Sequence, residues 1–271
     1  MSTDPNGTGA APVTDLPLLE DDLGESGVIR ASEIVPEVDD MPAAAVMCWF
    51  PEVVDGVGAT ARAATTLRSE LGRNPLWVVD SPAGRPVAVL HPGVGAPLAA
   101  MFLEELAALG VRTVVGVGGA GALLPHLTLG HAVVLGSALR DEGTSFHYLP
   151  AGRVVEADPA GVDALSALLG REGVPYVVGR SWTTDAVFRE TPERVRRRRE
   201  EGCAVVEMEA AALLAVARFT GVRFAQLLLA ADSLAGPEWE HRGWTTAREA
   251  RAGMFGLALA GVDALLDGPT G

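Results

Sequence analysis

The sequence predicts a single three-layer α/β domain, in which helices flank a central β-sheet. Short apolar runs that read as strands alternate with helical patterns along most of the chain, and no linker or internal repeat divides them. Hydrophobic residues make up 48% of the 271 residues and charged residues 21%, a composition typical of globular proteins and not of disordered ones.

The strands are predicted where short apolar runs end at turn residues or at glycines. The turn Ser81-Pro82-Ala83-Gly84, for example, separates two of these runs. Strands are expected at residues 43–48, 76–79, 86–91, 112–117, 132–138, 176–179 and 223–231.

The helices are predicted from apolar residues at helical spacing, and the first of them stops at Gly110. Helices are expected at residues 97–109, 162–170, 192–201, 207–220 and 246–266. Residues 1–25 are rich in Gly, Pro, Thr and Asp and predict a disordered acidic tail, which leaves residues 26–271 for the catalytic domain.

The charges exclude several classes of protein. All 21 basic residues are arginines, so a lysine Schiff base, a pyridoxal-phosphate enzyme and a Walker-type phosphate loop are excluded. The net charge is −14, of which residues 1–41 carry −9, because they hold ten acidic residues and one arginine. We therefore expect no nucleic-acid partner, although Arg194 and Arg196–Arg199 form a basic cluster. Glutamates at helical spacing around that cluster indicate a solvated helix face.

Other residue types indicate what the chain lacks. Its two cysteines form no disulfide framework, and its five histidines show no metal-binding spacing, so no metal is expected. No apolar run reaches the ~18 residues that a membrane span needs, and no basic-then-apolar signal pattern opens the chain. The expectation is a cytoplasmic protein without a membrane partner.

The stretch Gly116–Gly121 matches the dinucleotide-binding pattern G-x-G-x-x-G. That reading needs a long helix directly after the glycines, but Pro125 follows within four residues, before Thr128-Leu129-Gly130 and another strand. The preferred interpretation is that these glycines let a ligand or another backbone approach the end of a strand closely.

The stretch Glu207-Met208-Glu209 places two carboxylates around a methionine among apolar residues. Acidic residues in the first turn of a helix suit its dipole, which is a purely structural explanation. The alternative is that a carboxylate here accepts hydrogen bonds from the vicinal hydroxyls of a ribose. The residues alone leave both readings open.

Asp232 follows eight uncharged residues, 224–231, that predict a buried strand. Ligands of open α/β sheets bind at the carboxyl ends of strands, where burial also raises a carboxyl pKa toward neutrality. Asp232 is therefore a candidate acid, and its structural alternative is a cap on the turn Ser233–Gly236.

Four stretches in this order resemble the nucleoside phosphorylase superfamily, with its purine and uridine phosphorylases and its nucleosidases: residues 92–97, 118–125, 129–134 and 206–211. Residues 140–145 and 183–185 resemble its uridine-phosphorylase-like subgroup. The resemblance implies a mixed, distorted sheet flanked by helices, cleavage of a nucleoside N-glycosidic bond, and no metal or organic cofactor. It also implies a homo-oligomer built from dimers, in some relatives a hexamer, whose sites are completed across the dimer.

The resemblance also implies roles for individual residues. Met208 and Glu209 match residues that contact the ribose, and Asp232 matches the aspartate that protonates a purine base. Glu207 belongs to the same substrate-binding stretch. Gly118 and Gly119 are expected beside the sugar and the nucleophile, and Thr184 and Phe188 beside the base.

The expected phosphate site departs from the family pattern. A glycine–arginine loop is replaced by Trp49–Val53, and an arginine and a threonine are replaced by Gly116 and Gly119. Only Arg73 matches a phosphate-binding arginine, one that the family supplies from a neighbouring subunit. Loss of the others removes the bidentate clamps that suit a phosphate dianion.

Three functions stay open at this point. The chain is a phosphorylase that uses inorganic phosphate, a nucleosidase in which Glu52 activates water, or a nucleoside-binding protein without catalysis. A carboxylate at Glu52 would repel phosphate and suit water.

Overall fold

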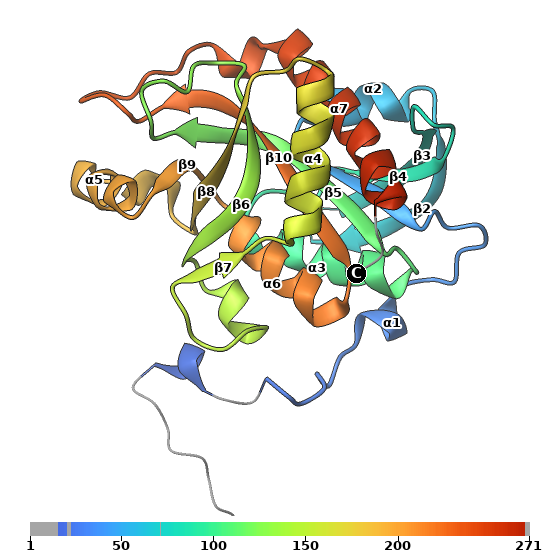
Figure 1. The fold of residues 1–271 in the computed structure, drawn as a ribbon. Coiled ribbons are helices and arrows are strands. Elements are labelled where there is room, and N and C mark those ends of the chain that lie inside the picture. The colour runs from blue at the N-terminus through green and yellow to red at the C-terminus, as the bar shows by residue number, and fades with distance from the viewer. Residues whose placement is uncertain (1–15, 21–22, 71, 269–271) are drawn as a thin grey trace, which may run out of the picture.

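The computed structural model describes residues 16–20, 23–70 and 72–268. Within them, ten strands form one mixed sheet with helices on both of its faces (Figure 1). The order of the strands along the sheet is β10-β6-β8-β9-β5-β1-β4-β3-β2, and β7 pairs with β6. The strands are β1 (Ala44–Cys48), β2 (Arg62–Ser69), β3 (Gly72–Asp80), β4 (Pro86–Leu90), β5 (Thr113–Ala122), β6 (Ala132–Asp141), β7 (Val154–Glu156), β8 (Tyr176–Thr184), β9 (Cys203–Glu207) and β10 (Arg223–Ser233).

One end of the sheet closes on itself. Strand β10 pairs in parallel with β5 and antiparallel with β6, so β5, β10, β6, β8 and β9 form a ring. The last side of the ring is a short antiparallel contact in which Gly121 and Ala122 of β5 pair with Val206 and Val205 of β9. This closure brings the glycine-rich half of β5 against the end of β9.

The helices cover the sheet on two sides. The cluster of buried side chains that includes α3 and α6 packs on one face, and the cluster that includes α4 and α7 packs on the other. This is the predicted three-layer arrangement. The α-helices of the described residues are α1 (Ala31–Ile34), α2 (Pro51–Gly58), α3 (Ala96–Ala108), α4 (Pro159–Arg171), α5 (Pro192–Glu200), α6 (Ala210–Thr220) and α7 (Arg248–Asp267).

The structure confirms each predicted strand and helix and corrects several boundaries. Strand β5 continues through the glycine stretch to Ala122, so these glycines lie inside a strand and not in a loop before a helix. Glu207 ends β9, and α6 begins only at Ala210. The sequence did not predict α1, α2, β2, β7 or β9. Strand β2 is mostly polar and half-exposed, so it lacks an apolar run.

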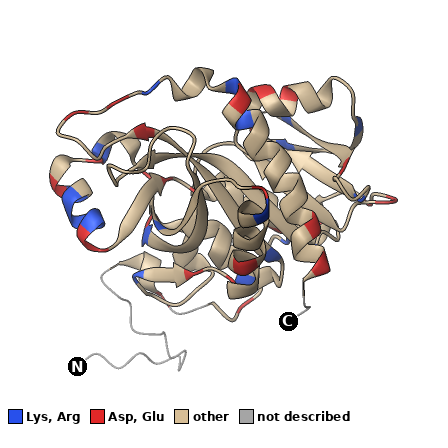
Figure 2. Ribbon diagram, turned by 45° about the horizontal axis from the view of Figure 1, so that its top comes forward, with Lys and Arg blue, Asp and Glu red and all other residues tan. Residues whose placement is uncertain are grey.

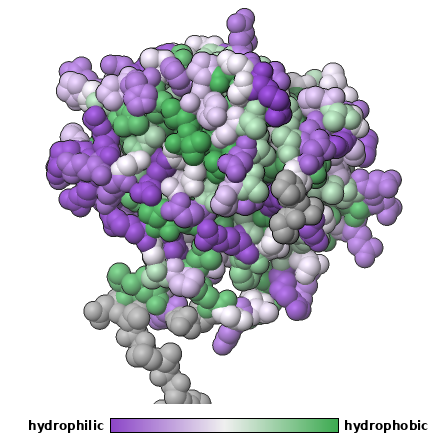
Figure 3. Space-filling model, viewed as in Figure 1, coloured by the Kyte–Doolittle hydropathy of each residue, from purple (hydrophilic) through white to green (hydrophobic). Residues whose placement is uncertain are grey.

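The N-terminal segment lies largely outside the described residues. Of the expected disordered tail, residues 1–25, the described part contains a short 3-10 helix at Pro17–Leu19. Just after this tail, the apolar side chains of Val28 and Ile29 are exposed. Hydrophobic residues are also visible at the bottom of the space-filling view (Figure 3).

Among the described residues, no helix combines the length and the apolar character needed to cross a bilayer. Basic residues gather on α5, whereas acidic residues are spread over many elements (Figure 2).

Candidate active site

A cavity of about 260 Å³ lies where β5, the turn from β9 to α6, and the end of β10 meet. The glycines of β5 form one wall, and the lining is more apolar than polar. Residues 118 and 121 of β5 are separated by about 10 Å at the usual rise of a strand, a length comparable to that of a nucleoside. The residues that line the cavity include Trp49, Val94, Gly118, Gly119, Gly121, Val187, Glu190, Val206, Glu207, Met208, Glu209, Gln226, Asp232, Leu234 and Trp244.

Glu207 is buried and its carboxylate is fully engaged by the protein. Oε1 accepts hydrogen bonds from the hydroxyls of Ser181 and Thr183, each at 2.6 Å. Oε2 accepts from the backbone N–H groups of Glu209 at 2.7 Å and Ala210 at 2.6 Å. Glu207 therefore joins β8 to β9, caps the N-terminus of α6, and fixes the turn that carries Met208 and Glu209.

Glu209 is buried but only partly engaged. Its Oε1 accepts a hydrogen bond from the backbone N–H of Gly95 at 2.6 Å. Gly95 has a φ of 103°, a conformation that favours glycine. Burial, together with the nearby Glu207 carboxylate, raises the pKa of Glu209 to about 8. The same carboxyl group also has a backbone hydrogen bond with Met208, and it lines the cavity.

Asp232 lies near the end of β10 and is held by an aromatic side chain. The indole N–H of Trp239 donates to Oδ2 at 2.7 Å. Oδ1 lies 3.5 Å from the position that a Cβ would take at Gly121. The same Cβ would lie 2.8 Å from Leu234 Cδ1, so a side chain at position 121 would require Leu234 to move.

A glutamine occupies space beside the position where the family pattern has an arginine. A Cβ at Gly116 would lie 3.1 Å from Cγ of Gln226, its register partner on β10. At Gly118, a Cβ would lie 3.1 Å from Cβ of Trp49. Gln226 and Trp49 thus occupy the space that a side chain at Gly116 or Gly118 would need.

Two buried polar atoms on the cavity lining lack hydrogen-bond partners. They are Nε1 of Trp49, a donor, and Oε1 of Gln226, an acceptor. Buried polar groups are normally paired, so these two atoms indicate that the cavity takes a polar ligand or water. A neutral hydroxyl or water molecule satisfies a donor and an acceptor at once.

The cavity is acidic. Four carboxyl groups line it, those of Glu190, Glu207, Glu209 and Asp232, and no arginine is among the described lining residues. The chain has no lysine to supply a cation instead.

The structure brings six of the predicted site residues together and places four elsewhere. Gly118, Gly119, Glu207, Met208, Glu209 and Asp232 line the cavity. Thr184 is buried, and its hydroxyl accepts a hydrogen bond from the backbone N–H of Ala186. Phe188 is 98% exposed, although its neighbour Val187 lines the cavity.

Glu52 and Arg73 are not among the lining residues of this cavity. Glu52 forms an ion pair with Arg251 at 2.9 Å, and the Arg251 guanidinium also lies over the rings of Phe50 and Trp244. Arg73 lines a second cavity together with His91, and Val94 lines both cavities.

Sequence reasoning missed Glu190, Gln226 and Trp244 as lining residues. Glu190 follows the short 3-10 helix Val187–Arg189, and no motif marks it. Gln226 offered a signal, since it is the single polar side chain in residues 224–231 of the predicted strand.

Comparison with known proteins identifies the family. Residues 43–260 match the model of the phosphorylase superfamily. The chain belongs to this superfamily. A curated uridine phosphorylase from Haemophilus influenzae is 32% identical over 105 residues, which cover 39% of this chain and 42% of that protein. A guanosine phosphorylase from Halorubrum lacusprofundi is 34% identical over 143 residues, which cover 52% of this chain and 58% of that protein. The chain thus spans about half the length of these curated relatives.

Solved structures of the superfamily share the fold over a larger part of the chain. The uridine phosphorylase of Vibrio fischeri ES114 in complex with 6-hydroxy-1-naphthoic acid has a TM-score of 0.67 and 25% identity, over 83% of this chain and 90% of that chain. The purine nucleoside phosphorylase of Toxoplasma gondii in complex with immucillin-H has a TM-score of 0.71 and 21% identity, over 84% of this chain and 93% of that chain. Both confirm the predicted mixed sheet flanked by helices.

Proposed function

We propose that this protein cleaves the N-glycosidic bond of a nucleoside and transfers the pentosyl group to a nucleophile. The observation that carries the proposal is that one cavity holds a buried carboxyl group, Glu209, and a second carboxyl group, Asp232, beside the glycine wall of β5. Glu209 accepts hydrogen bonds from the ribose hydroxyls, and Met208 packs against the sugar. Asp232 interacts with the leaving base.

The reaction requires charge stabilisation at both ends of the bond. Positive charge develops on the sugar as the bond to the base breaks, and nearby carboxylates stabilise it electrostatically. Negative charge develops on the base, and a proton from an acid at the Asp232 end neutralises it.

Phosphorolysis is the first form of this proposal, because the curated relatives are a uridine phosphorylase and a guanosine phosphorylase. The products would be the free base and ribose 1-phosphate. In this form Arg73 of a neighbouring copy supplies the cation that the described lining lacks, in a homo-oligomer with sites shared across a dimer.

Hydrolysis is the second form, and the acidic lining favours it. This lining offers a phosphate dianion no arginine, and any ionised carboxylate in it repels the anion unless a cation accompanies it. Water needs no cation, and the unpaired Trp49 Nε1 and Gln226 Oε1 suit it. Glu52 is ion-paired with Arg251, so in this form we propose no role for Glu52 as the base.

Release of base from inosine, adenosine, guanosine, uridine and cytidine, each with and without phosphate, tests the proposal. Release that requires phosphate supports the first form, and Arg73→Ala should then abolish this phosphate-dependent release. Equal release without phosphate supports hydrolysis. If no nucleoside is cleaved while the fold stays intact, the catalytic proposal is wrong and the binding-protein alternative takes its place.

A further inference from the structure

Glu190 is a cavity residue that has no role in the proposed function. Its side chain lines the main cavity and also an adjoining cavity of about 200 Å³ beside α5. In the part of the chain that the structure describes, its carboxyl has neither a hydrogen bond nor an ion pair. Burial, together with the Asp232 carboxylate, raises the pKa of Glu190 to about 7.

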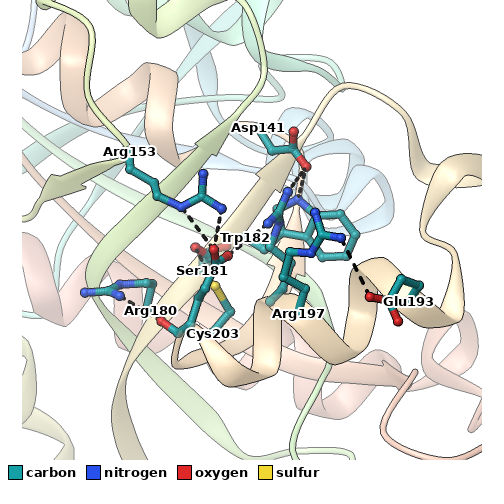
Figure 4. Close-up of polar contacts among 10 residues, drawn as sticks. Asp141, Arg153, Arg180, Ser181, Trp182, Glu193, Arg197 and Cys203 are labelled. Atoms are coloured by element: carbon teal, nitrogen blue, oxygen red, sulfur yellow. Dashed lines mark hydrogen bonds and ion pairs between the residues drawn. The ribbon is translucent and has the colours of Figure 1, made fainter.

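Three arginines of α5 form ion pairs or hydrogen bonds with groups other than Glu190. Arg196 pairs with Glu193 and Glu200, and Arg199 donates to the backbone carbonyl of Ala235 at 3.1 Å. Arg197 extends toward Glu193, away from Trp182 (Figure 4).

The remaining buried arginine of α5 is equally occupied. Arg198 pairs with Asp141 and Glu201 and lies over the ring of Trp182. Trp182 itself donates to Asp141 at 2.9 Å (Figure 4). Within the described residues, none of these four arginines therefore pairs with Glu190, and Glu238, which also lines the adjoining cavity, adds negative charge on that side.

We propose that Glu190 and Asp232 together select the base, and that the site prefers a base that offers two adjacent N–H donors on one edge, as guanine does, over uracil. This inference rests on the proposed function and identifies its substrate class. Glu190 is the specificity-determining residue, and Trp239 is a positioning residue that holds Asp232.

The chemistry of the base edges supports this choice. The ring N–H and the exocyclic amino group of guanine match the two oxygens of one carboxylate, a bidentate arrangement. Its carbonyl oxygen and the nearby ring nitrogen are hydrogen-bond acceptors on another edge of the base, so they leave the two N–H donors free for the carboxylate.

Uracil fits this pair poorly. Its one free ring N–H lies between two carbonyl oxygens, so any carboxylate that accepts from the N–H also faces a carbonyl acceptor. A polar site that leaves such groups unpaired discriminates strongly against the analogue. The unpaired, buried Oε1 of Gln226 in the same cavity is independent evidence that a polar ligand belongs there.

The variant Glu190→Gln tests the inference, because it keeps the shape of the side chain and replaces one acceptor oxygen by a donor. Its kcat/KM for guanosine should fall about 100-fold. The fall for inosine, which lacks the amino group, should be smaller. The kcat/KM for uridine should be unchanged or higher. Glu193→Gln is the matched control, three residues away on the exposed side of α5, and should leave all three values unchanged.

Calorimetric titration of free guanine and free uracil into the wild type and both variants provides a readout that does not depend on turnover. Guanine should bind the wild type more tightly than uracil, and Glu190→Gln should remove the difference. A wild type that prefers uracil or uridine, or a Glu190→Gln variant that keeps the wild-type preference, overturns the inference. Absence of cleavage with a preserved preference for guanine contradicts the proposed function but not the base selection.

Discussion

Glu207 and Glu209 are two residues apart, yet their surroundings assign them different tasks. Glu207 accepts four hydrogen bonds that join β8, β9 and α6, whereas the carboxyl of Glu209 accepts one from the backbone N–H of Gly95 in the loop before α3 and lines the cavity. The first carboxylate is therefore part of the scaffold and the second is free to serve a substrate. The sequence stretch that contains both could not distinguish them, because the difference lies in hydrogen bonds from β8 and from the loop before α3.

The variant Glu209→Gln should lose most of the catalytic activity. Its amide oxygen can keep the bond to Gly95, but its NH2 group replaces the other carboxyl oxygen and cannot accept a hydrogen bond from a sugar hydroxyl, so kcat/KM should fall about 100-fold. Steady-state kinetics on a ribonucleoside and its 2′-deoxy counterpart measure the effect. Discrimination between the two sugars should shrink in the variant, and unchanged discrimination would contradict a ribose contact at Glu209.

The raised pKa of Glu209 predicts how stability depends on pH. The folded protein holds a proton on this carboxyl up to about pH 8, whereas the unfolded chain releases it near its ordinary pKa. The contribution of the protonated Glu209 carboxyl to the free energy of unfolding is present at low pH and is lost as the pH rises through about 8. Relative to Glu209→Gln, the free energy of unfolding of the wild type should fall by about 3 kcal/mol between pH 5 and pH 8.5.

Urea unfolding of both proteins at these two pH values, without ligand, measures this difference. Glu190 contributes in the same direction in both proteins, since the pKa of its carboxyl is also raised. The comparison therefore reports Glu209 together with its interaction with Glu207, and parallel pH profiles for the two proteins would show that the pKa of Glu209 is not raised.

At the scale of elements, the junction of β8, β9 and α6 depends on one side chain. The variant Glu207→Ala leaves two hydroxyls and two backbone N–H groups without their acceptor in the interior. We expect a loss of about 3 kcal/mol in the free energy of unfolding, measured by urea denaturation. Glu207→Gln, which keeps one acceptor oxygen, should lose less, and equal losses would argue that packing and not hydrogen bonding explains the effect.

Helices and strands whose sequences show a clear apolar pattern were predictable. Strands that depend on pairing with a distant part of the chain were not. Strands β1 and β10 are nearly continuous apolar runs, so their sequences reveal them. Strand β2 depends on its antiparallel partner β3, and most of its side chains are polar. The extension of β5 through its glycines depends on β9 and β10, which pair with it from distant parts of the chain.

The candidate site shows the same limit. Met208, Glu209 and Asp232 were predicted because they occur in a recognisable stretch or at the end of an apolar strand. Glu190 reaches the cavity from a loop after β8, and only the three-dimensional arrangement of that loop places it beside Asp232.

At the scale of the whole molecule, the closed end of the sheet should be its most stable part. Strand β5 has neighbours on both sides, β1 and β10, whereas β2 is an edge strand with a single partner. Native-state hydrogen exchange should find the slowest amides in β5 and β10 and much faster ones in β2. Protection in β2 equal to that in β5 would contradict this ranking and would indicate that another surface covers the edge.

The aromatic residues around the two cavities give the protein an optical property. Of its five tryptophans, Trp49 and Trp244 line the main cavity, Trp239 binds Asp232, and Trp77 lines the second cavity. Indole emission is sensitive to local polarity, so arrival of a ligand changes the signal of the unlabelled protein. Fluorescence quenching thus offers a direct titration of site occupancy, without turnover or a dye.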